Sequence, residues 1–231
     1  MAIVNITEDS FSDGGLYVDI RSAINHASLC IKQGAHILDI GAQSTRPGAS
    51  EVGVEIEIKR LVPLIKELKL LHPNILISVD TFHHSVAEKV LNVGADLIND
   101  VSGGRHDPEI FNVIADKGCP YVLTHSRGNS KTMDSMALYT NVVNEVKNEL
   151  SNQIDIALSK GIKKDQIIID PGIGFAKNVD QNLTLLRNLE EFVSMNYPVL
   201  IGASRKRFIG SVINETDPNK RIFGMAAVAS R

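Results

Sequence analysis

The sequence predicts an α/β domain of the (β/α)8 TIM-barrel class, truncated before its eighth strand. Seven short runs rich in Ile, Val and Leu show no polar alternation, which is typical of strands buried on both faces of a parallel sheet. Helical patterns lie between these runs. Nearly every run ends in a polar residue, which favours a barrel, because a barrel collects functional groups from the carboxyl ends of many strands. The alternative, an open doubly wound sheet, would concentrate function at one switch point.

The predicted elements alternate along the whole chain. The predicted strands are, in order, AIVN (2–5), HILDIG (36–41), ILISVD (75–80), DLINDV (96–101), PYVLTH (120–125), QIIIDPG (166–172) and PVLIG (198–202). Helical patterns at 22–35, 85–95 and 148–162 end near Gly34, Gly94 and Gly161, respectively. Each glycine is placed as a left-handed helix stop. A further helical pattern closes the chain.

No linker or low-complexity segment divides the sequence, so we expect residues 1–231 to form a single domain. Met1 lies almost inside the first predicted strand, and no eighth strand follows the last helical pattern. We therefore expect the domain to be incomplete at both ends, with unpaired edges on its first and seventh strands. Expressed alone, such a chain is expected to be poorly soluble and inactive.

The composition excludes several classes of partner. The formal net charge of -3 provides no general attraction to nucleic acid or to an anionic membrane surface. No segment approaches the roughly 20 apolar residues of a membrane span. Cys30 and Cys119 are too few and too distant in sequence for a disulfide framework or a zinc site, which indicates free thiols in a reducing compartment.

Five polar residues at the ends of predicted strands form a candidate site. Taken one at a time, each could be a helix cap or a turn residue. Five at equivalent places of five units favour a shared function. Their carboxylate and amide groups suit a magnesium ion, or a flat heterocycle with N–H donors and ring acceptors along its edge. The five residues are Asn5, Asp39, Asp80, Asn99 and Asp170.

Three polar loops add to the candidate site. The segment GASRKRFIG (202–210) places Ser204 at a predicted helix start, followed by Arg205 and Lys206. Its position after the seventh strand, where barrels often bind phosphate, predicts an anion site. The loops NITEDSFSDGG (5–15) and AQSTRPGAS (42–50) are too rich in special residues to be simple connections.

Six motifs in order resemble those of the dihydropteroate synthases of folate biosynthesis. They are NITEDSFSDGG, DIGAQSTRPG, SVDT, INDVSGG, DPGIGFAK and GASRKRFIG, and they span essentially the whole chain. The resemblance implies a (β/α)8 barrel that joins p-aminobenzoate to 6-hydroxymethyl-7,8-dihydropterin diphosphate and releases pyrophosphate. Two alternatives stay open. One is a methyltetrahydrofolate-dependent methyltransferase, and the other is a non-catalytic pterin-binding paralogue or the inactive remnant of a fused protein.

The resemblance also implies roles for the candidate residues. Asp80, Asn99 and Asp170 would bind the pterin edge, with Asp39 close to the same pocket. Lys206 would lie against the pterin ring as a catalytic residue. Asn5 would be a Mg2+ ligand beside the diphosphate. Ser204 and the helix start behind it would receive the benzoate carboxylate, and Arg205 would be a further substrate-binding residue.

Loops 5–15 and 42–53 would fold over the site and shield it from water. The resemblance implies that Asp9 and Arg46 act in catalysis. The aminobenzoate pocket would be shaped by Asp9, Phe11, Thr45, Arg46, Pro47 and Phe175.

Some residues depart from the usual family pattern. Glu8 replaces the usual proline of the first loop, and Ala42 and Gln43 are closer in style to eukaryotic, often bifunctional, members. In the family the eighth strand brings an Arg and a His to the diphosphate. The resemblance further implies a homodimer, fusion to other folate-pathway domains in some members, and a cytoplasmic location, or a mitochondrial one in a eukaryote.

Overall fold

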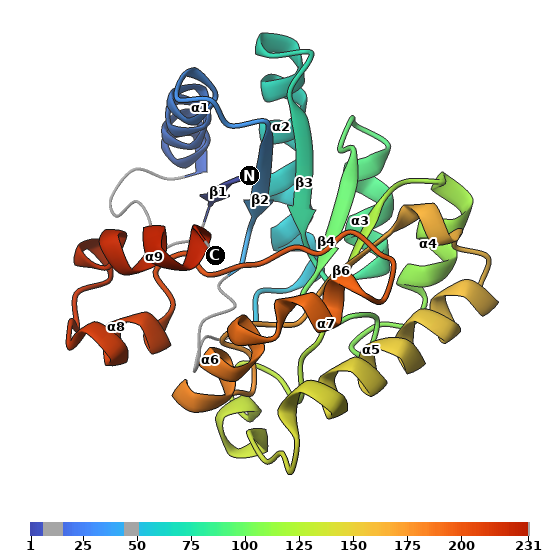
Figure 1. The fold of residues 1–231 in the computed structure, drawn as a ribbon. Helices are drawn as coiled ribbons and strands as arrows, with labels where there is room; N and C mark the ends of the chain where they lie inside the picture. The colour runs from blue at the N-terminus through green and yellow to red at the C-terminus, as the bar shows by residue number, and fades with distance from the viewer. Residues whose placement is uncertain (7–15, 44–50, 231) are drawn as a thin grey trace.

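The computed structural model describes residues 1–6, 16–43 and 51–230, and its centre is a parallel sheet. Six strands lie in the order β1-β2-β3-β4-β5-β6, so each strand pairs with the next in the chain (Figure 1). This arrangement agrees with the predicted α/β barrel topology for the first six units. The strands are β1 (Ala2–Asn5), β2 (Ile37–Gly41), β3 (Leu76–Asp80), β4 (Leu97–Asp100), β5 (Tyr121–Thr124) and β6 (Ile167–Asp170).

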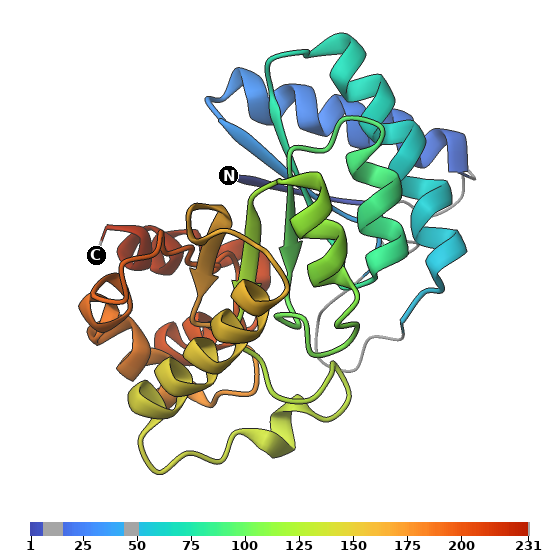
Figure 2. The same cartoon turned by 90° about the vertical axis from the view of Figure 1, so that its right-hand side faces the viewer.

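Helices connect the strands and pack in chain order around the sheet (Figures 1 and 2). They are α1 (Leu16–Lys32), α2 (Val54–Leu71), α3 (His84–Leu91), α4 (Ile110–Lys117), α5 (Val142–Ser159), α6 (Val179–Arg187), α7 (Leu189–Val193), α8 (Arg207–Ile213) and α9 (Ile222–Ala229). Short 3-10 helices span Met133–Met136, Lys164–Gln166 and Pro218–Lys220. No helix of the described ranges is long and apolar enough to cross a membrane.

The predicted seventh strand is wrong in its extent. The run 198–202 pairs with β6 through a single parallel bridge between Ile169 and Val199. The Ile169 N–H donates to the carbonyl of Pro198 at 2.9 Å, and the Leu200 N–H donates to the carbonyl of Ile169 at 2.8 Å. Pro198 has no N–H to add to a ladder, and the described residues provide no strand on the other side of this run.

The main core lies between the sheet and the helices. Side chains of alternate strand residues point toward the helices and are completely or almost completely buried; they include Val4, Leu38, Ile40, Ile77, Val79 and Ile98. On the opposite face, which we call the inward face, Ile3 is 48% exposed and Leu76 is 46% exposed. The expectation of strands buried on both faces therefore does not hold at these two inward positions.

The predicted helix stops are confirmed. Gly34, Gly94 and Gly161 have φ angles of +96°, +111° and +97°, which lie in the left-handed region that favours glycine. Each consecutive pair of strands is parallel, because the connection between them returns the chain to the amino end of the sheet. Their carboxyl ends, and the polar residues there, therefore meet at one rim of the fold.

Candidate active site

Four residues form one inward row across the carboxyl ends of β1 to β4. The strand register pairs Asn5 with Gly41, Gly41 with Asp80, and Asp80 with Asn99. A Cβ atom added to Gly41 would lie 3.0 Å from Asn5 Oδ1 and 3.5 Å from Asp80 Cβ. The absence of a side chain at Gly41 thus lets the Asn5 and Asp80 side chains approach each other.

Asp39 lies on β2 two residues before Gly41, where it pairs with Ser78 on β3, and it is 8% exposed. Ser78 Oγ donates to Asp39 Oδ1 at 2.6 Å, and Asn99 Nδ2 donates to Asp39 Oδ2 at 3.0 Å. Burial raises the pKa of Asp39, and these two hydrogen bonds oppose the rise. Both carboxylate oxygens are engaged, so Asp39 holds the Asn99 amide in one orientation with its carbonyl oxygen directed away from Asp39.

Asp39 accepts two hydrogen bonds, whereas the Asp80 carboxylate accepts none from the described residues. Among the described residues, no hydrogen bond or ion pair engages this carboxylate. Burial raises the pKa of Asp80 well above its ordinary value, and the charges of Asp39, Glu57 and Asp100 raise it further, while Lys206 opposes the rise. An acceptor in a low-dielectric site without a donor is suited to receive N–H groups from a ligand.

Asp170 ends β6 and is 6% exposed. Its Oδ1 accepts a hydrogen bond from the Gly172 N–H at 2.7 Å. Burial raises the pKa of Asp170 to about 6, against the opposing effects of the Gly172 hydrogen bond and of Lys206 and Lys177. Asp170 therefore retains one oxygen, Oδ2, for which no protein donor is found in the described ranges.

Lys206 brings a positive charge to these carboxylates. Burial lowers the pKa of Lys206, while Asp170 and Asp80 oppose the change. Its Nζ lies 4.0 Å from the centre of the Phe175 ring, within the range of a cation–π contact. Gly174 has a φ of +82°, and a Cβ atom there would lie 2.7 Å from Lys206 Cδ, so this glycine makes room for the lysine stem.

Ser204 and Arg205 are exposed and precede the helix that was expected to begin at Ser204. Helix α8 begins at Arg207, with Lys206 as its N-cap residue, so the predicted helix start is wrong by three residues. Arg205 has a φ of +53°, and Arg221 Nη1 donates to its carbonyl at 2.9 Å. The sharp turn at Arg205 directs the chain away from an immediate helix.

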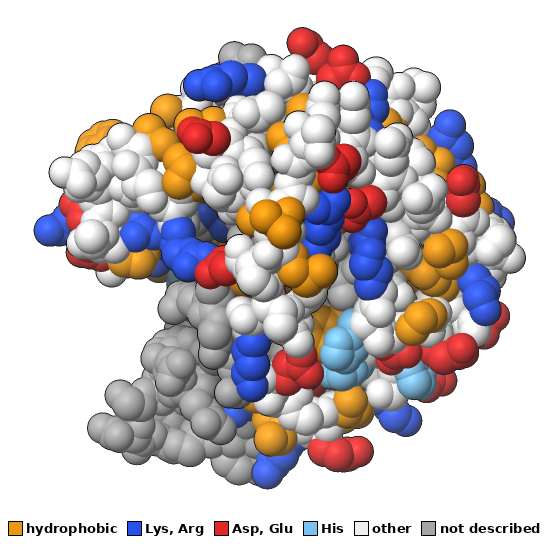
Figure 3. Space-filling view, turned by 90° about the horizontal axis from the view of Figure 1, so that it is seen from below, with side chains coloured by type: hydrophobic (Ala, Val, Ile, Leu, Met, Phe, Trp, Pro, Cys, Tyr) orange, Lys and Arg blue, Asp and Glu red, His pale blue; other side chains and the backbone are white. Residues whose placement is uncertain are grey.

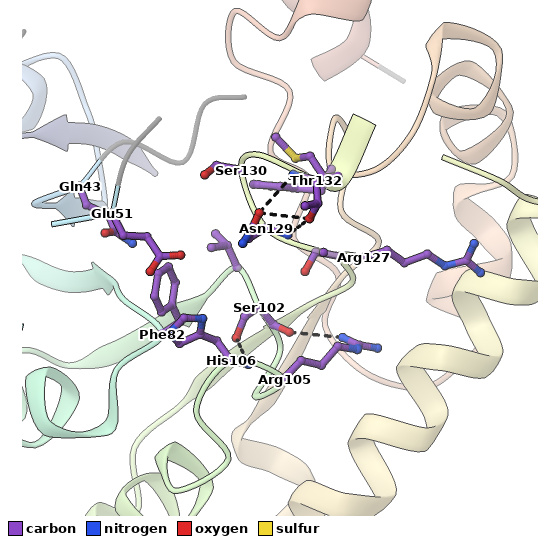
Figure 4. A pocket seen from close by; sticks show the side chains of 15 residues that line it. Gln43, Glu51, Phe82, Ser102, Arg105, His106, Arg127, Asn129, Ser130 and Thr132 are labelled. Carbon is purple, nitrogen blue, oxygen red and sulfur yellow. Dashed lines mark hydrogen bonds between the residues drawn. The ribbon is translucent and has the colours of Figure 1, made fainter. Parts of the chain in front are cut away.

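A cavity of about 380 Å³ opens beside this polar floor (Figure 4). Its wall includes Phe82 and His106 on one side and Asn129 and Ser130 on the other. Phe175 borders the cavity and also contacts Lys206, so the cavity and the polar floor adjoin. Seen from the carboxyl ends of the strands, the surface is hollowed on one side, with Lys and Arg side chains along the edge (Figure 3).

The structure brings together five predicted site residues: Asp39, Asp80, Asn99, Asp170 and Lys206. It places two other polar strand-end residues elsewhere. Asp100 and His125 point to the helix side and are fully buried. Five predicted loop residues lie outside the described residues: Asp9, Phe11, Thr45, Arg46 and Pro47.

Sequence reasoning missed the cavity wall formed by Phe82, His106 and Ser126. Each of these residues follows a predicted strand by one to five positions, and that position is the one signal that could have identified them. No group of three or more His, Cys, Asp or Glu side chains that could hold a metal occurs among the described residues. A magnesium ion would therefore depend on isolated oxygen donors and on the substrate.

Comparison with known proteins shows the family to which this chain is similar. The model of the pterin-binding enzyme family matches residues 1–231. The chain is 45% identical over 231 residues to a dihydropteroate synthase of Synechocystis, covering 100% of this chain and 80% of that protein. It is 44% identical to the folic acid synthesis protein fol1 of Pneumocystis carinii, covering 98% of this chain but 31% of that protein. Similar identities to bacterial and fungal relatives leave the expected affinity to eukaryotic members undistinguished.

Solved structures agree with the sequence matches. A dihydropteroate synthase of Clostridium difficile, determined in the presence of pteroic acid, has a TM-score of 0.92 and 39% identity, covering 99% of this chain and 84% of that chain. A dihydropteroate synthase of Xanthomonas albilineans with 4-aminobenzoic acid has a TM-score of 0.92 and 40% identity, covering 99% and 81%, respectively. These matches confirm the predicted barrel class.

Proposed function

The chain belongs to the pterin-binding enzyme family and has the dihydropteroate synthase activity of folate biosynthesis, and we propose how its residues divide the reaction. Two substrates must meet, a pterin diphosphate and p-aminobenzoate. The polar floor of Asp80, Asn99 and Asp170 binds the pterin, and the adjoining cavity at Phe175 receives the aminobenzoate. The observation that carries this assignment is the half-buried Asp80 carboxylate, to which no described residue donates, beside Asn99 and near Lys206.

The pterin edge is rich in N–H donors. Asp80 and the free oxygen of Asp170 accept these donors, and each such bond favours the charged form of an acid whose pKa burial has raised. Asn99 adds its carbonyl oxygen, because Asp39 holds the amide nitrogen. Asp39 thereby acts on the pterin through Asn99.

Lys206 lies against the pterin ring in this proposal. Its ammonium group is close enough to Asp80 and Asp170 to interact with both, and its contact with the Phe175 ring limits the positions that it can take. From there it donates a hydrogen bond to a ring acceptor. A fixed donor needs no reorganisation when charge moves during the substitution.

The aminobenzoate binds along Phe175, with its carboxylate toward the exposed turn of Ser204 and Arg205. Its amine then faces the pterin methylene, and the new C–N bond forms as the C–O bond to pyrophosphate breaks. Family resemblance supports a role at this pocket for five residues outside the described ranges, Asp9, Phe11, Thr45, Arg46 and Pro47. Enclosure of the site protects the electrophilic methylene from water.

The residues present fit a magnesium ion in a limited way. Asn5 Oδ1 is an exposed, hard oxygen donor beside Asp80, and Mg2+ commonly combines few protein ligands with substrate phosphate oxygens. Asn5 would hold the ion together with the diphosphate. When bound, the ion neutralises charge on the departing pyrophosphate.

Three wider proposals concern assembly, fusion and location. A homodimer is supported by the apolar surface of α8 and α9, where Phe223 is 86% exposed and Val212 is 55% exposed. Fusion to other folate-pathway domains is supported by the fol1 relative, which is much longer than this chain. A cytoplasmic site of action, or a mitochondrial one in a eukaryote, is supported by the free thiols of Cys30 and Cys119.

A pyrophosphate-release assay with both substrates and Mg2+ tests the assignment. Lys206→Met should reduce pterin binding measured by calorimetry, whereas Phe175→Ala should raise the KM for p-aminobenzoate with little change in pterin affinity. Lys164→Met, at an exposed lysine near the opposite end of β6, is the control and should behave as the wild type. Equal pterin affinity in Lys206→Met and the control would contradict the proposed floor.

A further inference from the structure

The turn that follows β6 has an unusual backbone. Gly172 and Gly174 have φ angles of +72° and +82°, and Ala176, which is not a glycine, has a φ of +48°. A left-handed alanine costs free energy and persists only where the surroundings impose it. We call residues 171–177 the β6 turn, and its conformation requires an explanation from outside the turn.

The β6 turn carries three features of the site. The Gly172 N–H donates to Asp170, the Phe175 ring contacts Lys206 Nζ, and Gly174 leaves space for the Lys206 stem. A change of about 1 Å in this turn would displace both an acceptor for the pterin and a wall of the aminobenzoate pocket. Misplacement on that scale can reduce catalysis by about 100-fold.

Lys177 holds the turn from behind. Its side chain is buried, and its Nζ lies 3.0 Å from the carbonyl oxygen of Gly172, 2.9 Å from the carbonyl oxygen of Phe175 and 3.0 Å from His125 Nδ1. An ammonium group has three donors, and here all three have an acceptor. Two of the acceptors are in the β6 turn itself, so Lys177 joins both parts of the turn to His125, which directly follows strand β5.

His125 anchors this clamp to the helix layer. Because its Nδ1 accepts from Lys177, the ring of neutral His125 carries its proton on Nε2 and donates to Glu149 Oε2 at 3.1 Å. Burial and the Lys177 charge lower the pKa of His125 to about 4, which agrees with a neutral ring. Glu149, on α5, is held in turn by Arg127. The β6 turn is thus fixed to a rigid helix through side chains.

The buried ammonium group of Lys177 does not gain stability for the fold from an ion pair. Among the described residues, no carboxylate lies within ion-pair distance of its Nζ, and burial lowers the pKa of Lys177 to about 7. Burial of an ammonium group on neutral acceptors is costly, and an apolar side chain of similar length would avoid that cost. Three convergent donors, however, hold the two carbonyl groups in a geometry that an apolar side chain cannot impose.

We propose that Lys177 is a positioning residue for the reaction, which acts through the β6 turn to place Phe175 for p-aminobenzoate and Asp170 for the pterin. This inference rests on the proposed function of those two residues. Lys177 itself lies behind the turn and touches neither substrate.

Lys177→Met tests the inference, because it keeps the length of the stem and removes every donor. We expect the KM for p-aminobenzoate to rise by about tenfold or more, with a smaller loss of pterin affinity in calorimetry. Lys164→Met is the matched control, and it should leave both quantities unchanged. An unchanged KM in a folded Lys177→Met enzyme would overturn the inference. A folded wild-type protein that binds neither the pterin nor p-aminobenzoate would instead refute the proposed function.

A double-mutant cycle separates positioning from general destabilisation. If Lys177 acts through Phe175, Lys177→Met should have little further effect on the aminobenzoate KM in a Phe175→Ala background. Equal effects in both backgrounds would contradict the proposal. If Lys177→Met fails to fold, Lys177→Gln retains two donors and should show the same KM increase to a smaller degree. A wild-type KM in that variant would also count against the proposal.

Discussion

Asp80 and Asp100 end neighbouring strands, yet their side chains have opposite surroundings. Asp100 points to the helix side and accepts hydrogen bonds from Tyr121 Oη at 2.6 Å, from the Ser102 N–H at 2.7 Å and from the Gly104 N–H at 2.8 Å. Asp80 points inward and receives no hydrogen bond from the described residues. Burial raises the pKa of both carboxyl groups. The inward carboxylate is available for a ligand, whereas the outward one stabilises the fold.

The residues around the two aspartates differ in the same way, with tight packing near Asp100 and room for side chains near Asp80. The donors to Asp100 set the loop after β4, where Gly104 has a φ of +77° and packs so closely that an added Cβ atom would lie 2.1 Å from Phe111 Cζ. On the inward face, the missing side chain at Gly41 instead leaves room for the Asn5 and Asp80 side chains to approach each other. A half-buried carboxylate to which no described residue donates, at the carboxyl ends of parallel strands, therefore points to a binding site.

The largest expected effect is on ligand binding at the inward face. Asp80→Asn replaces an acceptor by an amide that also presents N–H donors to the donors of the pterin. Binding should weaken by about 2–4 kcal/mol, roughly a 30- to 1000-fold increase in Kd, measured by calorimetry. The free energy of unfolding should stay constant or rise, because a carboxylate with a raised pKa is lost. A Kd equal to that of the wild type would contradict the proposed role.

Asp100→Ala should show the opposite pattern. It leaves the Tyr121 hydroxyl and two backbone N–H groups without their acceptor inside the protein. The free energy of unfolding should fall by about 2–4 kcal/mol in urea titrations. Pterin affinity of the folded variant should change far less than in Asp80→Asn. A stability equal to the wild-type value would show that the two aspartates do not differ as described.

Gly41→Ala tests the close approach of the Asn5 and Asp80 side chains, which the missing side chain at position 41 allows. The new methyl group would lie 3.0 Å from Asn5 Oδ1, and the Asn5 side chain can move to avoid it. We expect about a tenfold lower turnover at limiting Mg2+, partly restored at high Mg2+, with little change in stability. Gly53→Ala is the matched control, since an added Cβ atom there meets no atom of the described residues within 4 Å. Equal Mg2+ dependence in both variants would remove Asn5 from the proposed metal site.

The smallest expected effect concerns pH and the outward network. Hydrogen bonds from His125 and Arg127 lower the pKa of Glu149 from 4.5 to about 2. A lowered acid pKa stabilises the fold above about pH 4.5, and that stabilisation is lost as the pH falls toward 2. Glu149→Gln should therefore flatten the decline of the unfolding free energy over this window. An identical acid profile in the variant would show that Glu149 does not contribute.

Sequence reasoning anticipated much of this arrangement because parallel strands have a simple rule. Runs such as ILISVD and DLINDV indicate buried strands, and polar residues at their ends meet at one rim. The gathering of Asp80, Asn99, Asp170 and Lys206 followed from that rule and from the family motifs. Two of the errors, a full seventh strand at 198–202 and a helix start at Ser204, arose where pairing partners and a left-handed turn at Arg205 overrode the local pattern.

The sequence by itself determined the order of strands and helices, the glycine stops and the set of polar strand-end residues, since these depend on local periodicity and backbone freedom. Only the tertiary structure decided which of those residues face inward. Asp80 and Asp100 look equivalent in sequence, and His125 resembles a site residue until Lys177 and Glu149 enclose it. The reason is that orientation depends on strand register and on partners 21 to 52 residues away in the chain, which no local pattern records.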